Sequence, residues 1–166
     1  MRRTSVVAAA LKGAIGGAVA TWFMDKLTTL AYEQESEPVR EREDEARQGK
    51  TAYGVAAEKL ARRVARTTLS DEQRSRYGTA IHWALGIGTG ALYGALRNRA
   101  PIVGFARGLA FGTGVWLLVD ELANPLLGLT PGPRAFPWQA HARGLVGHLA
   151  YGAAVAAALD AVEPIG

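Results

Sequence analysis

The sequence predicts an all-α fold, a polytopic membrane bundle of about four transmembrane helices, with two repeated helical hairpins as a candidate internal symmetry. Three observations lead to this fold class. Four long apolar segments are each close to the ~20 residues that cross a hydrocarbon core of about 30 Å. Polar residues are concentrated between the first two segments. Glycines recur at four-residue intervals within the segments, as in helices that pack closely inside a membrane.

The four apolar segments contain few charges, and several of those charges lie near a segment end. The predicted membrane spans are about 6–27, 78–96, 102–122 and 140–159, within a single membrane domain of residues 1–166. A soluble bundle is the weaker interpretation, because residues 84–96 and 108–119 lack the polar stripes of soluble helices. A cleavable signal peptide is also disfavoured, since the first apolar run continues into Trp22 without a clear small-residue cleavage site.

Residues 33–77 are predicted to form a polar helical insertion between the first two spans. They hold 10 of the 19 basic residues and 10 of the 15 acidic residues. Pro38 indicates a helix start, and residues 70–73 have the capping-box pattern. Apolar residues of the stretch 53–64 recur at helical spacing opposite basic ones. This amphipathic helix would pack on the bundle or a partner, or lie on an anionic lipid surface.

The composition excludes several classes of function. The sequence has no cysteine, which rules out disulfides, thiolate metal sites and thiol catalysis. The net charge of +4 is modest, and basic residues outside the insertion are scattered near segment ends, so we expect no nucleic-acid binding. We find no nucleophile with its base at recognisable spacing, no phosphate loop and no HExxH motif, and therefore expect no enzyme.

Glycines at four-residue spacing mark the predicted helix-packing surfaces, because small residues let helix backbones approach closely in a membrane. The glycines expected to form these surfaces are Gly13, Gly17, Gly86, Gly90, Gly94, Gly108, Gly112, Gly144 and Gly152.

The same positions suggest an internal repeat. With an offset of 95 residues the first span aligns with the third, so that Asp25 matches Asp120. With an offset of 66 the second span aligns with the fourth, so that His82 matches His148. We therefore expect two hairpins of one plan, of which the first has the longer loop.

Ionisable residues of the spans are predicted to converge in the half of the membrane nearer the insertion. This polar cluster comprises Asp25, Asp120, Glu121, His82, His141 and His148. Intramembrane ionisable groups favour a functional role. The alternatives are that the aspartates cap helices at the interface, that the first and last histidines bridge helices, and that His141 is interfacial.

No cofactor follows from the sequence with certainty, but two histidines on alternate helices suit particular ligands. His82 and His148 would suit the axial positions of a b-type haem (haem b), with nearby glycines making room for the ring. Together with two carboxylates they would alternatively suit a divalent metal or a proton relay.

Three segments resemble a known family. They are Ile81-His82-Trp83 within residues 78–94, residues 124–131 (Asn-Pro-Leu-Leu-Gly-Leu-Thr-Pro) with Pro137-Trp138, and Gly147-His148-Leu149. They are similar to the YagU-like bacterial inner-membrane proteins, which carry a domain of unknown function. The likeness covers spans two to four, whereas the charged insertion departs from the family pattern. Both histidines fall on matching positions; the two aspartates do not clearly do so.

The resemblance implies a multi-pass protein of the bacterial plasma (inner) membrane with its N-terminus inside. Counting basic residues instead places the insertion in the cytoplasm, and we follow the resemblance. The first functional expectation is a non-enzymatic accessory subunit or homo-oligomer, whose partners are the lipid bilayer and other membrane subunits or itself. A proton-linked channel or transporter and a haem- or metal-binding redox protein are the alternatives.

Overall fold

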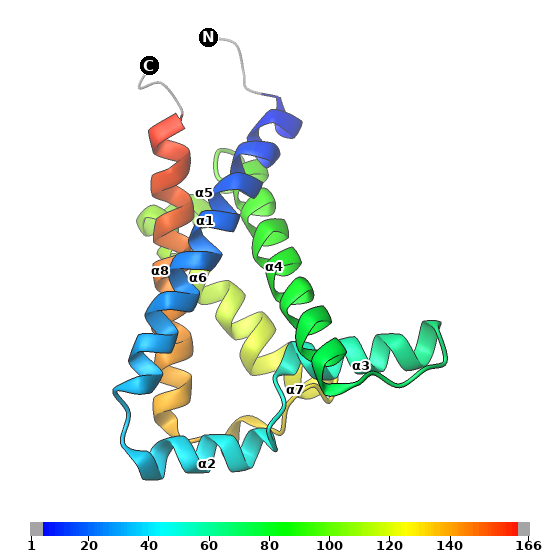
Figure 1. The fold of residues 1–166 in the computed structure, drawn as a ribbon. Helices are drawn as coiled ribbons and strands as arrows, with labels where there is room; N and C mark the ends of the chain where they lie inside the picture. Colours follow the sequence, from blue (N-terminus) through cyan, green and yellow to red (C-terminus); the bar gives the residue numbers. More distant parts are fainter. Residues whose placement is uncertain (1–4, 163–166) are drawn as a thin grey trace.

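The computed structural model describes residues 5–162, and every regular element in this range is helical, as the sequence predicts (Figure 1). The elements are α1 (Val6–Glu33), α2 (Glu37–Arg47), α3 (Ala52–Val64), α4 (Asp71–Leu96), α5 (Pro101–Gly104), η1 (Phe105–Gly108), α6 (Leu109–Val115), η2 (Trp116–Ala123), α7 (Asn124–Leu126), η3 (Pro133–Ala135) and α8 (Trp138–Val162).

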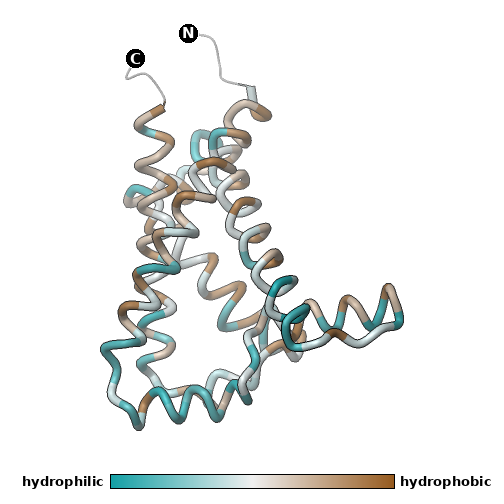
Figure 2. The backbone as a smooth tube through the Cα atoms, in the orientation of Figure 1, coloured by the Kyte–Doolittle hydropathy of each residue, from teal (hydrophilic) through white to brown (hydrophobic). Residues whose placement is uncertain are grey.

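Helix α1 is the centre of the bundle. It packs along both α4 and α8, and α6 packs on α8. The first turn of α1, the end of α4 and the last turn of α8 lie at one end of the bundle, while α2 and α3 lie at the other (Figure 1). Hydrophilic residues are concentrated along α2, in contrast to the mostly apolar long helices (Figure 2).

Three helical segments of the described chain are long and apolar enough to cross a membrane: Val6–Glu33, Pro101–Leu126 and Trp138–Val162. Helix α4 contains the predicted second span but is not among them. It carries His82 and several glycines and threonines, which lower its apolar content. The protein is therefore a helical bundle with three candidate membrane spans, and a fourth span remains a prediction.

The predicted third span, 102–122, lies within the candidate span Pro101–Leu126, but its helix is not continuous. Ala106, Arg107 and Gly108 are consecutive residues with positive φ angles of 50°, 53° and 86°. They separate α5 from α6, and the chain then continues as the π-helical turn η2. Left-handed backbone is unfavourable for residues with a Cβ atom, by about 1–2 kcal/mol each, so this break stores strain.

Glycines join α1 to α4 at very short range. A Cβ atom at Gly90 would lie 2.5 Å from the Cα of Gly17, and one at Gly17 would lie 2.6 Å from the carbonyl oxygen of Gly86. Gly13 and Gly94 meet in the same way. Because no side chain fits between the two helices, this surface depends on glycine.

A second glycine contact joins α6 to α8. Gly108 and Gly152 lie against each other's carbonyl groups, and Gly112 lies against the carbonyl of His148. A Cβ at Gly152 would lie 3.1 Å from the amide nitrogen of Gly112. In the proposed repeat, this contact corresponds to the one between Gly86 and Gly17. The repeat would also make the packing of α4 on α6 equivalent to that of α1 on α8. However, α1 and α8 pack closely, whereas α4 and α6 do not. The internal repeat remains a prediction.

One predicted packing glycine has a different environment. A Cβ at Gly144 would approach only side chains, the nearest being Trp116 at 3.1 Å. Gly78, which was not among the predicted packing glycines, approaches backbone: a Cβ there would lie 2.8 Å from the amide nitrogen of Gly54. This contact holds α3 against the start of α4.

The charged insertion forms α2 and α3, and α4 begins at Asp71, earlier than the predicted span. Ser70 accepts a hydrogen bond from the amide of Gln73, whose side chain accepts one from the amide of Ser70. This is the predicted capping box. The paired bonds explain why α4 starts seven residues before its apolar part.

Candidate functional site

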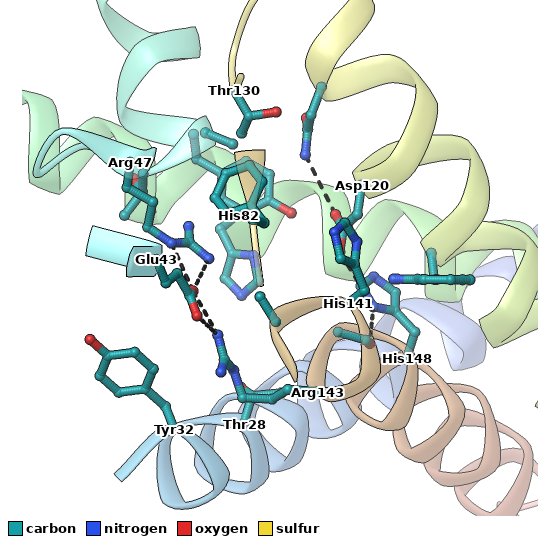
Figure 3. Close-up of a pocket in the computed structure, with 18 of the residues that line it drawn as sticks. Thr28, Tyr32, Glu43, Arg47, His82, Asp120, Thr130, His141, Arg143 and His148 are labelled. Carbon is teal, nitrogen blue, oxygen red and sulfur yellow. Dashed lines mark hydrogen bonds and ion pairs between the residues drawn. The ribbon is translucent and has the colours of Figure 1, made fainter. Parts of the chain in front are cut away.

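A pocket of about 720 Å³ lies where α2 and α3 meet the ends of the long helices (Figure 3). Its volume falls within the range of about 300–1,000 Å³ that small-molecule sites commonly have. The residues of the predicted polar cluster all line it: Asp25, Asp120, Glu121, His82, His141 and His148. The structure thus brings together side chains from α1, α4, η2 and α8, and pairs each histidine with a carboxylate.

The first pair joins α1 to α4. Nε2 of His82 lies 2.8 Å from Oδ1 of Asp25. The ring of Tyr53, from α3, lies 4.9 Å from the His82 ring between centroids. Burial, followed by the charges of Asp120 and Asp25, raises the pKa of Tyr53 above its ordinary value. Tyr53 therefore remains a neutral phenol at the pocket wall.

The second pair joins η2 to α8. Nδ1 of His148 lies 3.7 Å from Oδ2 of Asp120 and 2.9 Å from the carbonyl oxygen of Gly144. Hydrogen bonding to that carbonyl places the proton on Nδ1, so that Nε2 is the acceptor of the neutral ring. Asn124 lies on the other side of Asp120, with its amide nitrogen 3.5 Å from Oδ1.

The third pair lies closest to the proline-rich loop. Nδ1 of His141 is 2.6 Å from Oε1 of Glu121, and its Nε2 is 3.0 Å from the carbonyl oxygen of Pro133. Both ring nitrogens of His141 therefore have partners. A doubly protonated ring can donate to both.

Sequence reasoning missed a buried charge network on the opposite wall. Arg143, from α8, binds both oxygens of Glu43 at 2.6 Å and also pairs with Glu35. Arg47 also donates a hydrogen bond of 2.6 Å to Oε1 of Glu43. The side chain of Glu43 is only 2% exposed. Figure 3 shows Glu43 between the two arginines.

Burial alone would raise the pKa of Glu43. The hydrogen bond from Arg143 and the charge of Arg47 outweigh burial and lower that pKa below its ordinary value. The network therefore holds Glu43 as a carboxylate and ties α2 to α8. Its partners are about 100 residues apart, so no local sequence pattern reveals it.

The predicted haem b site does not fit the residues present. Nε2 of His82 is already bonded to Asp25. The glycines expected to make room for the ring are occupied by other groups. Gly54 lies against Gly78, Thr21 against Gly86, Trp116 against Gly144 and Gly108 against Gly152. A second pocket, lined by both histidines and Tyr151, measures only about 40 Å³.

A divalent-metal centre has no support either. Within residues 5–162, no group of three or more histidine, aspartate or glutamate side chains is arranged to hold a metal ion. Each histidine instead faces one carboxylate. Of the chemical roles predicted for these residues, proton exchange within carboxylate–histidine pairs matches the geometry best.

Comparison with known proteins gives one match. Residues 38–157 match a family model described as "Protein of unknown function (DUF1440)". The matched range covers all but the first residue of α2 and all of α3, so the charged insertion is part of this match. No curated protein and no solved structure shows significant similarity to the chain.

Proposed function

Because the chain belongs to the DUF1440 family of proteins of unknown function, we propose its role from its geometry: it binds a small cationic solute in a proton-linked manner within the membrane. The observation that carries this proposal is the set of three carboxylate–histidine pairs around one pocket. The proposed protein is a non-enzymatic, multi-pass transporter or channel.

The charge of the pocket selects a cation. On the α2 wall, Glu43 is neutralised by Arg47 and Arg143. On the other wall, the ion pairs of Asp25, Asp120 and Glu121 are with histidines. A neutral histidine leaves its carboxylate uncompensated, whereas a protonated histidine neutralises it. The deprotonated pocket would therefore attract cations, and protons would compete with them.

The proposed repeat supports alternating use of two similar sites. Asp25 and His82 occupy the positions that the repeat offsets match with Asp120 and His148. Both pairs line the same pocket. Repeated hairpins with a shared ion site are a common plan among secondary transporters. The break at residues 106–108 does not line this pocket and packs instead against Gly152 of α8.

The first expectation, an accessory subunit or a homo-oligomer, loses its main argument. Most of the predicted packing glycines meet another helix of the same chain and are unavailable to a partner. We retain the bilayer as the surrounding medium. From the resemblance we propose YagU-like identity and the bacterial inner membrane, and from the four apolar segments we propose four spans. Association with other membrane subunits or with itself is a further proposal of lower priority.

Ligand binding can be tested by fluorescence, because Trp83 and Trp116 line the pocket. Trp22 and Trp138 are exposed elsewhere and can be replaced by phenylalanine. Purified protein with these two replacements should transfer energy to bound ethidium, and tetraethylammonium should compete. Replacing the three carboxylates that pair with histidines (Asp25→Asn, Asp120→Asn, Glu121→Gln) should abolish the signal.

Asp160→Asn is the matched control. Asp160, near the end of α8, pairs with Arg97 at 2.7 Å, and neither residue lines the pocket. This variant should bind ethidium as the parent does. Equal ethidium binding by the triple variant, or preferential binding of the anion benzoate, would remove the proposal.

The proposed topology places both ends of the chain in the cytoplasm and residues 33–77 outside. Single cysteines at Gln48 and Asn98 test it, since the sequence contains no cysteine. An impermeant maleimide should label position 48 from outside and position 98 only after the membrane is opened. If both positions are labelled from the same side, α4 does not cross the membrane. If position 98 is labelled from outside and position 48 is not, residues 33–77 lie in the cytoplasm, as the count of basic residues indicates.

A further inference from the structure

Helix α3 contacts the bundle with only its first half. Ala52, Gly54 and Ala57 are buried, and Gly54 lies against Gly78 of α4. The rest of the helix extends crosswise to α4, away from the bundle (Figure 1). The segment 65–70 contacts the second half of α3 through the amides of Thr67 and Leu69, but it leaves Leu60 and Val64 exposed.

This free half is amphipathic. Leu60 and Val64, one turn apart, have exposed fractions of 57% and 74%. Lys59, Arg62 and Arg63 are exposed beside them. The only acid within residues 52–67 is Glu58, which already binds the Arg62 side chain and the Leu69 amide. An exposed apolar edge with excess positive charge is typical of helices that lie on anionic lipid.

The position of α3 relates it to the end of a candidate membrane span. Nζ of Lys59 donates a hydrogen bond of 2.6 Å to the carbonyl oxygen of Leu127. Leu126 ends the candidate span Pro101–Leu126 and is 82% exposed, and Leu127 is also exposed. Lys59 therefore places the second half of α3 close to the end of this span, where the span reaches the lipid–water boundary.

We propose that the second half of α3 lies on the bilayer surface, with Leu60 and Val64 inserted and the basic side chains contacting anionic headgroups. Continuity with the exposed leucines at the end of the span, together with the positive charge, favours lipid over a protein partner. This surface is separate from the pocket, and the proposal does not depend on what the pocket binds.

Site-specific fluorescence in vesicles tests the proposal on the full chain. Single cysteines are placed by Val64→Cys and by Gln48→Cys, both at exposed positions, and labelled with an environment-sensitive dye. The protein is reconstituted in vesicles of phosphatidylcholine, or of equal parts phosphatidylcholine and phosphatidylglycerol, each with a lipid-attached nitroxide quencher. Position 64 should show blue-shifted emission and quenching, stronger with phosphatidylglycerol, and position 48 neither.

Two further variants separate charge from apolar insertion. Arg62→Gln with Arg63→Gln should remove the difference between the two lipid compositions while leaving the protein folded, because both side chains are exposed. Emission from position 64 that resembles position 48 in both vesicles would overturn the proposal. Shielding of position 64 that depends on protein concentration and not on lipid would overturn it in favour of a protein partner.

Discussion

Oδ1 of Asp25 and Nε2 of His82 lie 2.8 Å apart, and this pair joins α1 to α4 beside the pocket. Their predicted counterparts, Asp120 and His148, face each other at 3.7 Å across η2 and α8. A carboxylate beside a histidine combines a contact between two helices with a site that can exchange a proton. This arrangement underlies the predictions below.

The Asp25–His82 pair should be energetically coupled. We expect the losses in unfolding free energy for Asp25→Asn and His82→Gln to be non-additive by about 0.5–3 kcal/mol, as for other contacting pairs. The distant combination of Asp25→Asn with Asp160→Asn should be additive within about 0.5 kcal/mol. Denaturation in detergent micelles measures both cycles. Additivity in the first cycle would mean that the two side chains do not interact.

The α1–α4 surface should not tolerate a methyl group at its centre. Gly90→Ala should cost about 1–3 kcal/mol, because the new Cβ would lie 2.5 Å from Gly17 Cα and the helices must separate. Gly88→Ala is the matched control on the same helix, since a Cβ there meets nothing within 4 Å. Thermal unfolding should separate the two variants; equal melting temperatures would refute close glycine packing.

Local and periodic signals allowed much of the fold to be predicted. The start of α4 followed from Ser70 and Gln73, and the convergence of the polar cluster followed from the helical rise of about 1.5 Å per residue. The break at residues 106–108 could not be predicted, because Ala106 and Arg107 favour right-handed helix and no proline marks the site. The Glu43–Arg143 pair depends on tertiary folding alone.

Acid should release α2 from the bundle. The pKa of Glu43 is lowered in the folded protein, so its stabilising contribution is present above the unfolded glutamate pKa of about 4.3 and is lost as pH falls through the lowered value. Hydrogen exchange, corrected for the intrinsic effect of pH, should show α2 losing protection over that range. Constant protection of α2 would contradict the assigned role of Glu43.

Removing Arg143 should weaken the same contact at neutral pH. Arg143→Gln leaves the carboxylates of Glu43 and Glu35 without this partner and should cost about 3–5 kcal/mol. Arg62→Gln, whose side chain is 65% exposed in its pair with Glu58, should change stability by at most about 1 kcal/mol. Chemical denaturation compares the variants. A similar effect of both substitutions would show that burial does not strengthen the Arg143 network.

The break in the third helix should be relieved by glycine. Ala106→Gly should stabilise the protein by about 1 kcal/mol, because glycine adopts the left-handed backbone of position 106 without steric cost. Ala157→Gly, at an exposed site inside α8, should destabilise it by about 1 kcal/mol. Melting temperatures in detergent should rise for Ala106→Gly and fall for Ala157→Gly. A lower melting temperature for Ala106→Gly would indicate a right-handed backbone at position 106.

The competition between cations and protons at the three carboxylate–histidine pairs is tested most directly by binding tetraethylammonium to purified protein in weak buffer, with affinity and proton release recorded together. The measurements are made as a series of pH values on both sides of neutrality, where histidine is the side chain most suited to exchange a proton. The affinity should rise with pH, and binding should release protons on the acid side but few on the alkaline side. An affinity that is independent of pH or that falls as pH rises would contradict the account.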